Sequence, residues 1–294
     1  MQGDVRMDGR RSRTLLKHAI AQLTCRMRAD ALTAAVEEAV LGPSIRIINY
    51  HDVPPGWARH FETQLAYFKD RFEPATISDL REVLAGHRRS TRPGLIITFD
   101  DGLRSHAEVA APFLEKYGFT GWFFVPPAFL SCPVEDQQSF ARASAIIHFE
   151  REPRVAMTWD QARQLATRHT VGCHSLTHVR LASSLGEERL ASEIVGSKTV
   201  LERELDMPVS SFCWVGGEEW AYSREAARYI CEAGYDWALM TNTLPAWRRT
   251  DPLQLQRTNV EAWDPSEVVR FQLSGLMDVY YAAKRRRINE LTRF

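Results

Sequence analysis

Two adjacent carboxylates directly after an apolar run are the feature that most constrains this chain. Residues 95–99 read Leu-Ile-Ile-Thr-Phe, a pattern typical of a buried β-strand, and Asp100, Asp101 and Gly102 follow at once. Two neighbouring ionised carboxylates repel each other, so each needs a partner, and a divalent cation is the most direct one. An Asp-Gly pair also ends many strands in an ordinary polar turn, so this stretch alone leaves both interpretations open.

A pair of histidines further along the chain favours a metal site. His174 and His178 follow a second expected strand, residues 170–173, and are four positions apart. In a helical turn this spacing places both imidazoles on one side. Two histidines and one carboxylate, with positions left open, are typical of a catalytic metal site. Zinc suits two nitrogens and one oxygen, although cobalt, nickel or iron also fits these donors.

Together the two stretches resemble the polysaccharide deacetylase family, which is carbohydrate esterase family 4 with its NodB-like domain. Residues 98–102, Thr-Phe-Asp-Asp-Gly, match the first family motif in full. Residues 174–178, His-Ser-Leu-Thr-His, match the second, of form His-Ser/Thr-x-x-His. The resemblance begins near residues 49–51, Asn-Tyr-His, and continues to about Arg257. It implies an irregular (β/α) barrel of about seven parallel strands.

The order of the expected elements agrees with an α/β barrel. Expected strands alternate with segments of helical period, which implies parallel pairing through right-handed crossovers. Both motifs follow strands, at the end where barrel active sites lie. With 294 residues, 45% of them hydrophobic, the chain can form one large domain. We expect an N-terminal helical extension (residues 1–42), a catalytic domain (residues 43–283) and a basic C-terminal tail (residues 284–294).

Charge and cysteine content narrow the classes of function. Lys plus Arg and Asp plus Glu both number 37, so the formal net charge is zero and nothing indicates a nucleic-acid partner. Five cysteines at irregular spacing predict neither a disulfide framework nor a four-cysteine zinc site, and they favour a reducing compartment. The sequence shows no secretory segment and no run of ~20 apolar residues that could span a bilayer. We therefore expect a cytoplasmic protein.

The resemblance also implies roles for the motif residues. Asp101, His174 and His178 are expected to bind the metal, and Asp100 to act as the general base. The cation would lower the pKa of a water molecule and polarise an acyl carbonyl, which together suit the removal of an acetyl group.

The third family motif is altered in this chain. It usually reads as an aromatic residue or arginine, then proline, an aromatic residue and glycine, but residues 212–219 read Phe-Cys-Trp-Val-Gly-Gly-Glu-Glu. The arginine and the proline are both missing. From this stretch Trp214, Gly216 and Gly217 are predicted to contact substrate. Arg257 is also placed with the substrate-binding residues, as the counterpart of a later family arginine that orients acidic groups; an ordinary strand-end arginine is the alternative.

The general acid is the largest departure from the family. The last family motif supplies a histidine that protonates the leaving amine, whereas all nine histidines of this chain lie at or before His178. We predict Glu218 or Glu219 as the replacement because they follow the glycines of the third motif. A solvated pair of loop carboxylates is the alternative. His51 ends the first expected strand and could approach the site, either toward the substrate or in a structural role.

These observations predict a metal-dependent hydrolase that removes an acetyl group, in the first place an N-acetyl group, from a saccharide or glycan precursor. One alternative keeps the fold and the metal but hydrolyses a non-sugar amide. Another is a degenerate barrel that binds glycan without turnover, which the missing histidine and the altered third motif would suit.

The two ends of the chain raise the question of a membrane. Residues 1–28 hold seven Lys or Arg, and residues 284–287 read Lys-Arg-Arg-Arg. A helical period over residues 13–41 is interpreted either as a helix packed on the catalytic domain or as peripheral contact with the inner face of a membrane, where a lipid-linked glycan would be found. Its apolar positions are Leu16, Ile20, Leu23, Met27, Leu32, Val36 and Val40. The oligomeric state has no signal in the sequence.

Overall fold

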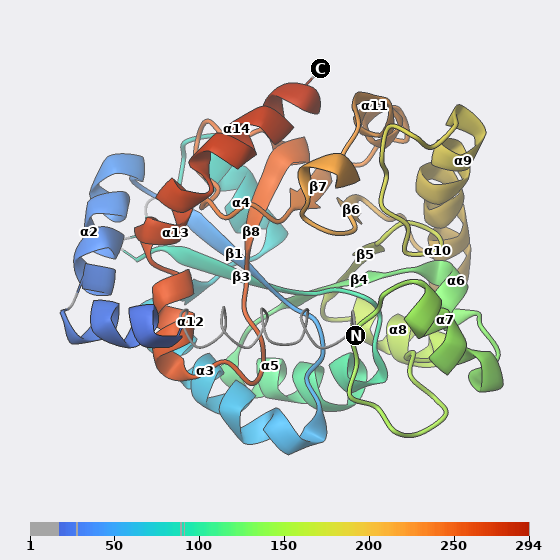
Figure 1. Cartoon of the computed structure of the whole chain (residues 1–294), viewed down its shortest axis with the longest axis horizontal. Coiled ribbons are helices and arrows are strands. Elements are labelled where there is room, and N and C mark those ends of the chain that lie inside the picture. Colours follow the sequence, from blue (N-terminus) through green and yellow to red (C-terminus); the bar gives the residue numbers. More distant parts are fainter. Residues whose placement is uncertain (1–17, 28, 89, 91, 294) are drawn as a thin grey trace, which may run out of the picture.

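A closed barrel of parallel strands forms the centre of the computed structural model, which describes residues 18–293 except 28, 89 and 91 (Figure 1). Within this part, seven strands pair in sequence order and the last returns to the first, and a two-residue strand, β2 (Glu73–Pro74), extends the edge of β3. The prediction of an irregular (β/α) barrel of about seven parallel strands is confirmed. The barrel strands are β1 (Ile45–Tyr50), β3 (Gly94–Phe99), β4 (Gly121–Val125), β5 (Thr170–Cys173), β6 (Ser211–Cys213), β7 (Trp237–Met240) and β8 (Leu255–Asn259).

Helices surround the barrel, and residues 18–26 are helical as well. Threonine caps open two of the helices: Thr76 and Thr158 each accept a hydrogen bond from the backbone three residues on, in complete capping boxes. The helices are α2 (Ala29–Leu41), α3 (Ala58–Arg71), α4 (Ile77–Leu84), α5 (Ala111–Tyr117), α6 (Pro127–Leu130), α7 (Gln137–Ala143), α8 (Trp159–Ala166), α9 (Glu187–Ala191), α10 (Ser197–Leu205), α11 (Arg224–Glu232), α12 (Ser266–Gln272), α13 (Gly275–Tyr280) and α14 (Ala282–Leu291).

The strands are buried on both faces, which explains their nearly continuous apolar sequences. All six residues of β1 and all six of β3 are buried. Alternate side chains enter different layers: Ile97 and Phe99 belong to a cluster that includes residues of α3, whereas Ile96 belongs to a second cluster with Trp122 and Phe124. This two-sided burial makes the barrel a rigid support for the loops at the carboxyl ends of its strands.

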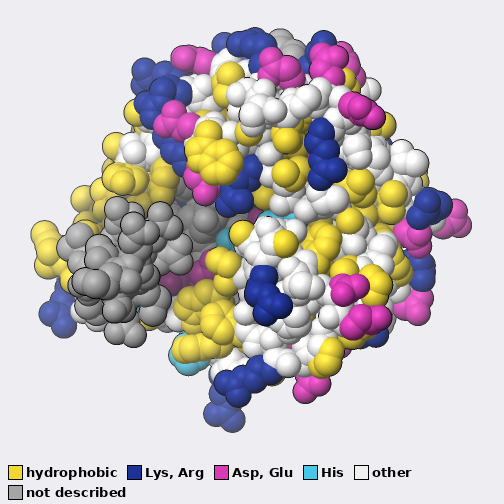
Figure 2. All heavy atoms as spheres, turned by 45° about the vertical axis from the view of Figure 1, so that its right-hand side comes forward, with side chains coloured by type: hydrophobic (Ala, Val, Ile, Leu, Met, Phe, Trp, Pro, Cys, Tyr) yellow, Lys and Arg dark blue, Asp and Glu magenta, His cyan; other side chains and the backbone are white. Residues whose placement is uncertain are grey.

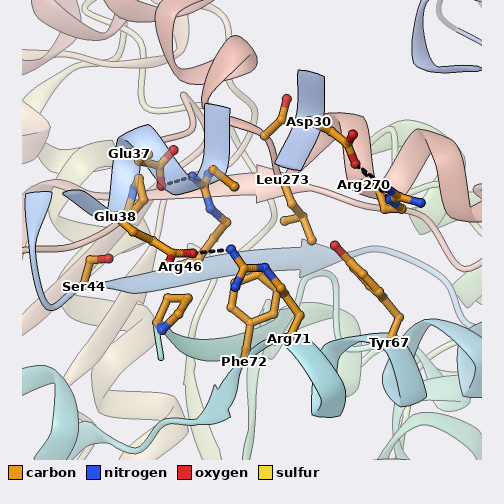
Figure 3. A pocket seen from close by; sticks show the side chains of 14 residues that line it. Asp30, Glu37, Glu38, Ser44, Arg46, Tyr67, Arg71, Phe72, Arg270 and Leu273 are labelled. Atoms are coloured by element: carbon orange, nitrogen blue, oxygen red, sulfur yellow. Dashed lines mark hydrogen bonds and ion pairs between the residues drawn. The ribbon is translucent and has the colours of Figure 1, made fainter. Parts of the chain in front are cut away.

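Helix α2 contacts the barrel through its charged side. Figure 3 shows a pocket at this contact, where carboxylates of α2 meet arginines of the barrel and its helices. Glu37 Oε1 accepts a hydrogen bond from Arg46 Nη2 at 2.5 Å, and Asp30 Oδ2 lies 2.7 Å from Arg270 Nη2. The interpretation that the apolar stripe packs on the domain is wrong for all of its described members, because their side chains are exposed: Ile20, Leu23, Met27, Leu32, Val36 and Val40. Leu16, the first member of the stripe, lies outside the described residues.

The basic C-terminal segment also differs from its prediction. Residues 284–291 belong to α14 and do not form a tail. Ile288 is buried, and Arg285 donates hydrogen bonds to the backbone oxygens of Asn242 and Thr243, so both apolar and polar contacts hold the helix on the barrel. The division of the chain near residues 42 and 283 stays a prediction. Within the described part of the chain, no helix has the length and apolar character required to cross a bilayer.

Candidate metal centre

A pocket of about 330 Å³ opens at the carboxyl ends of the barrel strands. Its lining comes from segments that follow β1, β3, β5, β6, β7 and β8, so it lies where parallel barrels place their active sites. Figure 2 shows a hollow on one face of the molecule with histidine and carboxylate side chains inside it. The pocket residues predicted from the sequence are His51, Asp100, Asp101, His174, His178, Gly216, Gly217 and Glu218.

Three of these side chains converge on one point. Asp101 Oδ1 lies 2.9 Å from His178 Nε2 and 3.5 Å from His174 Nε2, and all three side chains are buried. Burial alone would raise the pKa of Asp101, but the charges and hydrogen bonds of the two imidazoles hold its pKa well below the ordinary value. The same carboxylate raises the pKa of His178 against the opposite effect of burial.

The far nitrogens of the two rings show that this cluster suits a cation. His174 Nδ1 lies 3.0 Å from the carbonyl oxygen of Cys213, and His178 Nδ1 lies 2.8 Å from that of Ser144. A carbonyl only accepts, so each Nδ1 carries a proton, and in the neutral form of each ring the lone pair of Nε2 faces Asp101. Three acceptors then face one another, an arrangement that a divalent cation stabilises. Asp101, His174 and His178 therefore fit as ligands.

The backbone around the cluster is strained at the residues that carry it. Asp101, Ser175 and His178 have φ angles of 79°, 54° and 58°, in the left-handed region that non-glycine residues rarely adopt. Such strain persists only where the surroundings enforce it, and it gathers at functional sites. Buried Glu193 is one such constraint, because it accepts hydrogen bonds from the backbone of Leu176 and from the backbone and hydroxyl of Thr177.

Asp100 is held by Arg257 inside the barrel. Two parallel hydrogen bonds run from Nη1 to Oδ1 at 2.7 Å and from Nη2 to Oδ2 at 2.8 Å. Burial would raise the pKa of Asp100, but the guanidinium keeps that pKa below its ordinary value, so the carboxylate is ionised. Arg257 is itself buried and does not line the pocket, so it orients Asp100 and does not reach a ligand there. The prediction that Arg257 orients an acidic group is confirmed, whereas its placement with the substrate-binding residues is corrected.

His51 enters the pocket with a carboxylate behind it. Its Nδ1 lies 3.0 Å from Glu261 Oε1, and the His51 side chain is 29% exposed. Burial alone would lower the pKa of His51, but Glu261 outweighs it and raises that pKa to about 10. Sequence reasoning missed Glu261. The register of the strands could have indicated this contact, because Asn49 of β1 pairs with Asn259 of β8. His51 lies two residues after Asn49, and Glu261 lies two residues after Asn259.

Of the two glutamates predicted as acids, only Glu218 lines the pocket. Glu218 is at the pocket, 3.3 Å from Arg180, while Glu219 forms an exposed ion pair with Arg287 at 2.5 Å. For Glu218, hydrogen bonds and Arg180 lower the pKa despite partial burial. For Glu219, the hydrogen bond from Arg287 lowers the pKa. Both carboxyls are thus ionised at neutral pH and hold no proton to donate, which counts against either one as the acid.

Trp214 is not available to a substrate. Its side chain is buried and packs against Tyr222, with ring centroids 5.0 Å apart. The prediction that it contacts substrate is therefore corrected to a core position. Gly216 and Gly217 do line the pocket, and Gly216 has φ 80°, which a residue with a side chain would adopt only under strain.

Comparisons with known proteins identify the family. The model of the family described as "Polysaccharide deacetylase" matches residues 87–238, and the chain belongs to this family. No curated protein matches it. Among solved structures, the deacetylase PplD of Streptococcus pyogenes, in complex with acetate, is 18% identical with a TM-score of 0.62, covering 79% of this chain and 98% of that one.

Two further structures are similar in the same way. IcaB from Ammonifex degensii is 19% identical with a TM-score of 0.60, and the match covers 79% of this chain and 96% of that chain. The BpsB deacetylase domain from Bordetella bronchiseptica is 18% identical with a TM-score of 0.59, over 75% and 97% of the two chains. At these identities the similarity shows a shared fold.

Proposed function

We propose that this protein is a metal-dependent hydrolase that removes an acetyl group, in the first place an N-acetyl group, from a saccharide. The observation that carries the proposal is the convergence of Asp101, His174 and His178 beside a tethered, ionised Asp100 in one pocket. Membership of the polysaccharide deacetylase family supports the reaction class. The three ligands would hold zinc in the first place, with cobalt, nickel or iron as alternatives.

A divalent cation bound by these three residues would supply a nucleophilic water at neutral pH and polarise the acyl carbonyl. Asp100 acts as the general base. Arg257 uses one lone pair of each carboxylate oxygen, and the Cys213 thiol donates a further hydrogen bond to Oδ1, so the second lone pair of Oδ2 is the one that accepts the proton of the attacking water. The fixed guanidinium also prevents the carboxylate from turning away, which keeps the base in its reactive orientation.

His51 acts as the general acid. Its ion pair with Glu261 keeps the imidazole protonated at neutral pH, and it lines the same pocket as Asp100. Nδ1 faces Glu261, so the Nε2 proton is the one available to the substrate. As the carbon–nitrogen bond breaks, this proton passes to the leaving nitrogen, and acetate and a free amine are released. The reaction then needs neither Glu218 nor Glu219.

The rest of the pocket suits a sugar. Asn49, Asn259, Thr241 and Arg180 line it, and their side chains can donate hydrogen bonds to hydroxyl groups. The structure of PplD contains acetate, which agrees with an acetyl group as the part removed. A lipid-linked glycan precursor remains our proposal for the physiological substrate, and the cytoplasm, with peripheral contact at the inner face of the membrane, is our proposal for the location. The five free cysteines fit that reducing compartment.

The test is release of acetate from N-acetylated chito-oligosaccharides by the purified full chain. We expect a chelator to abolish release and zinc or cobalt to restore it. Undiminished release after exhaustive metal stripping would overturn the proposal. If the protein binds metal and glycan without releasing acetate, it is the non-catalytic binding barrel, and if it releases acetate only from non-sugar amides, the substrate class is wrong.

A further inference from the structure

Helix α2 is oriented opposite to an ordinary surface helix. An amphipathic helix normally buries its apolar stripe and exposes its charges. Here Glu37, Glu38 and Asp30 face the barrel in ion pairs (Figure 3), and the apolar stripe faces outward. Leu32, Val36 and Val40 are 66%, 55% and 73% exposed. A stripe that tertiary packing leaves uncovered in this way marks an interaction surface.

Helix α13 continues this apolar surface. It lies beside α2 at one edge of the molecule (Figure 1), and its Val279 and Tyr280 are 76% and 75% exposed. Between the two helices runs a groove of about 480 Å³ with an almost entirely apolar lining. We call this the α2–α13 surface, formed by Leu32, Val36, Val40, Leu276, Val279 and Tyr280.

A basic side chain borders the α2–α13 surface. The exposed Arg286 lies one helical turn after Ala282, a groove residue, whereas Arg285 lines the groove with its guanidinium bonded to backbone oxygens of the barrel. The acidic groups of the same region are already engaged: Glu37 and Asp278 with Arg46, and Glu38 with Arg71. The surface is therefore apolar with a basic margin.

We propose that the α2–α13 surface docks on an anionic phospholipid leaflet. Apolar side chains that enter the interface and a basic side chain at headgroup level, here Arg286, are the two contributions that hold a peripheral protein on such a leaflet. A second copy of this chain fits less well, because a twofold interface would place the same basic margins opposite each other.

The position of the surface relates it to the candidate active site. Tyr281 and Lys284 line the pocket of the candidate active site. In the same stretch of chain, Ala282 and Arg285 line the groove of the α2–α13 surface. One helical segment thus forms a wall of the pocket and part of the docking face. Docking would bring the pocket beside the headgroups, where a saccharide carried by a lipid is found. The idea that the docked pocket meets a lipid-carried saccharide rests on the proposed function. The docking itself does not.

Vesicle co-sedimentation of the full chain tests the proposal. We expect binding to phosphatidylcholine vesicles that contain phosphatidylglycerol, weaker binding to phosphatidylcholine alone, and release by high salt. The double variant Val36→Gln/Val279→Gln should lose at least about tenfold in affinity for these vesicles. The matched control is Val195→Gln/Met207→Gln, since these side chains are also exposed but lie outside the surface, and it should bind like the wild type.

Two further experiments test the contribution of charge and the oligomeric state. Arg286→Gln should weaken binding to anionic vesicles about fivefold and leave binding to neutral vesicles unchanged. No binding at low salt, or equal binding by Val36→Gln/Val279→Gln and the wild type, would overturn the proposal. So would a dimer in light scattering that the same double variant dissociates, because a second copy would then cover the surface. Acetate release from a soluble oligosaccharide, measured in parallel, reports on the proposed function separately.

Discussion

Arg257 donates one hydrogen bond to each carboxylate oxygen of Asp100, at 2.7 and 2.8 Å, although the two residues are 157 positions apart in the chain. Both side chains are buried, so each charge depends on the other for compensation. The pair also connects β8 to the end of β3, the strand that presents Asp100 and Asp101. The carboxylate that we propose as the general base is in this way part of the barrel's interior.

Arg257→Gln should therefore destabilise the metal-free protein by about 3–5 kcal/mol at pH 7, because it leaves a buried carboxylate without its partner. The folded-state pKa of Asp100 is below its ordinary value of 3.8, so the stabilisation is present above that value and is lost as the pH falls through the folded pKa. Urea unfolding at pH 7 and at about pH 3 measures both effects. Arg203→Gln, which breaks an exposed pair with Glu204, is the control and should cost at most about 1 kcal/mol.

The assigned roles of the adjacent aspartates separate metal binding from turnover. Asp100→Asn should retain the metal and lose about 10²–10⁴-fold in acetate release, because it removes a base and not a ligand. Asp101→Ala, His174→Ala and His178→Ala should each lose the metal. Metal content after dialysis and acetate release measure the two properties independently. If Asp100→Asn loses metal as readily as Asp101→Ala, the division of roles is incorrect.

Substrates with different leaving groups distinguish His51 from Glu218 as the general acid. His51→Gln should slow release of acetate from an N-acetylated sugar about 10²–10⁴-fold, since the amine cannot leave without a proton. The same variant should lose far less on p-nitrophenyl acetate, whose leaving group needs no proton. Glu218→Gln should affect both substrates alike and weakly. A large effect of Glu218→Gln confined to the amide would instead restore Glu218 as the acid.

The His51–Glu261 pair should make stability depend on pH in the metal-free protein. The folded-state pKa of His51, about 10, exceeds the ordinary value of 6.5. The stabilisation by the ion pair is therefore complete below pH 6.5 and is lost as the pH rises toward 10. The difference in unfolding free energy between the wild type and Glu261→Gln should shrink across this interval. NMR titration of the His51 ring gives the pKa directly, and a value at or below 6.5 would contradict the ion pair.

Glu193 should prove necessary for the metal site without touching it. Glu193→Gln keeps the volume but loses the charge that orders the backbone of Leu176 and Thr177, between the two histidine ligands. We expect metal affinity to fall about 10–100-fold, as for other residues that orient ligands. Metal titration by calorimetry measures the affinity, and circular dichroism checks the fold. Glu188→Gln, the same substitution at an exposed glutamate of α9, is the control and should leave the affinity unchanged.

The sequence by itself determined the features that a few neighbouring residues encode. The strand ending in Asp100 and Asp101, the histidines four positions apart, and the alternation of strands and helices all depend on local spacing. The alternation predicts parallel pairing, and the resemblance carried by the two motifs predicts the closed barrel that the structure has. The tertiary structure alone decided which distant groups meet. Arg257 reaches Asp100, and Glu261 reaches His51, only because the barrel closes between β8 and β1 in one register. The same holds for burial: a local pattern shows that Trp214 and the stripe of α2 are apolar, but the fold decides that Trp214 is enclosed and Val36 is exposed, since burial depends on what the rest of the chain places against a side chain.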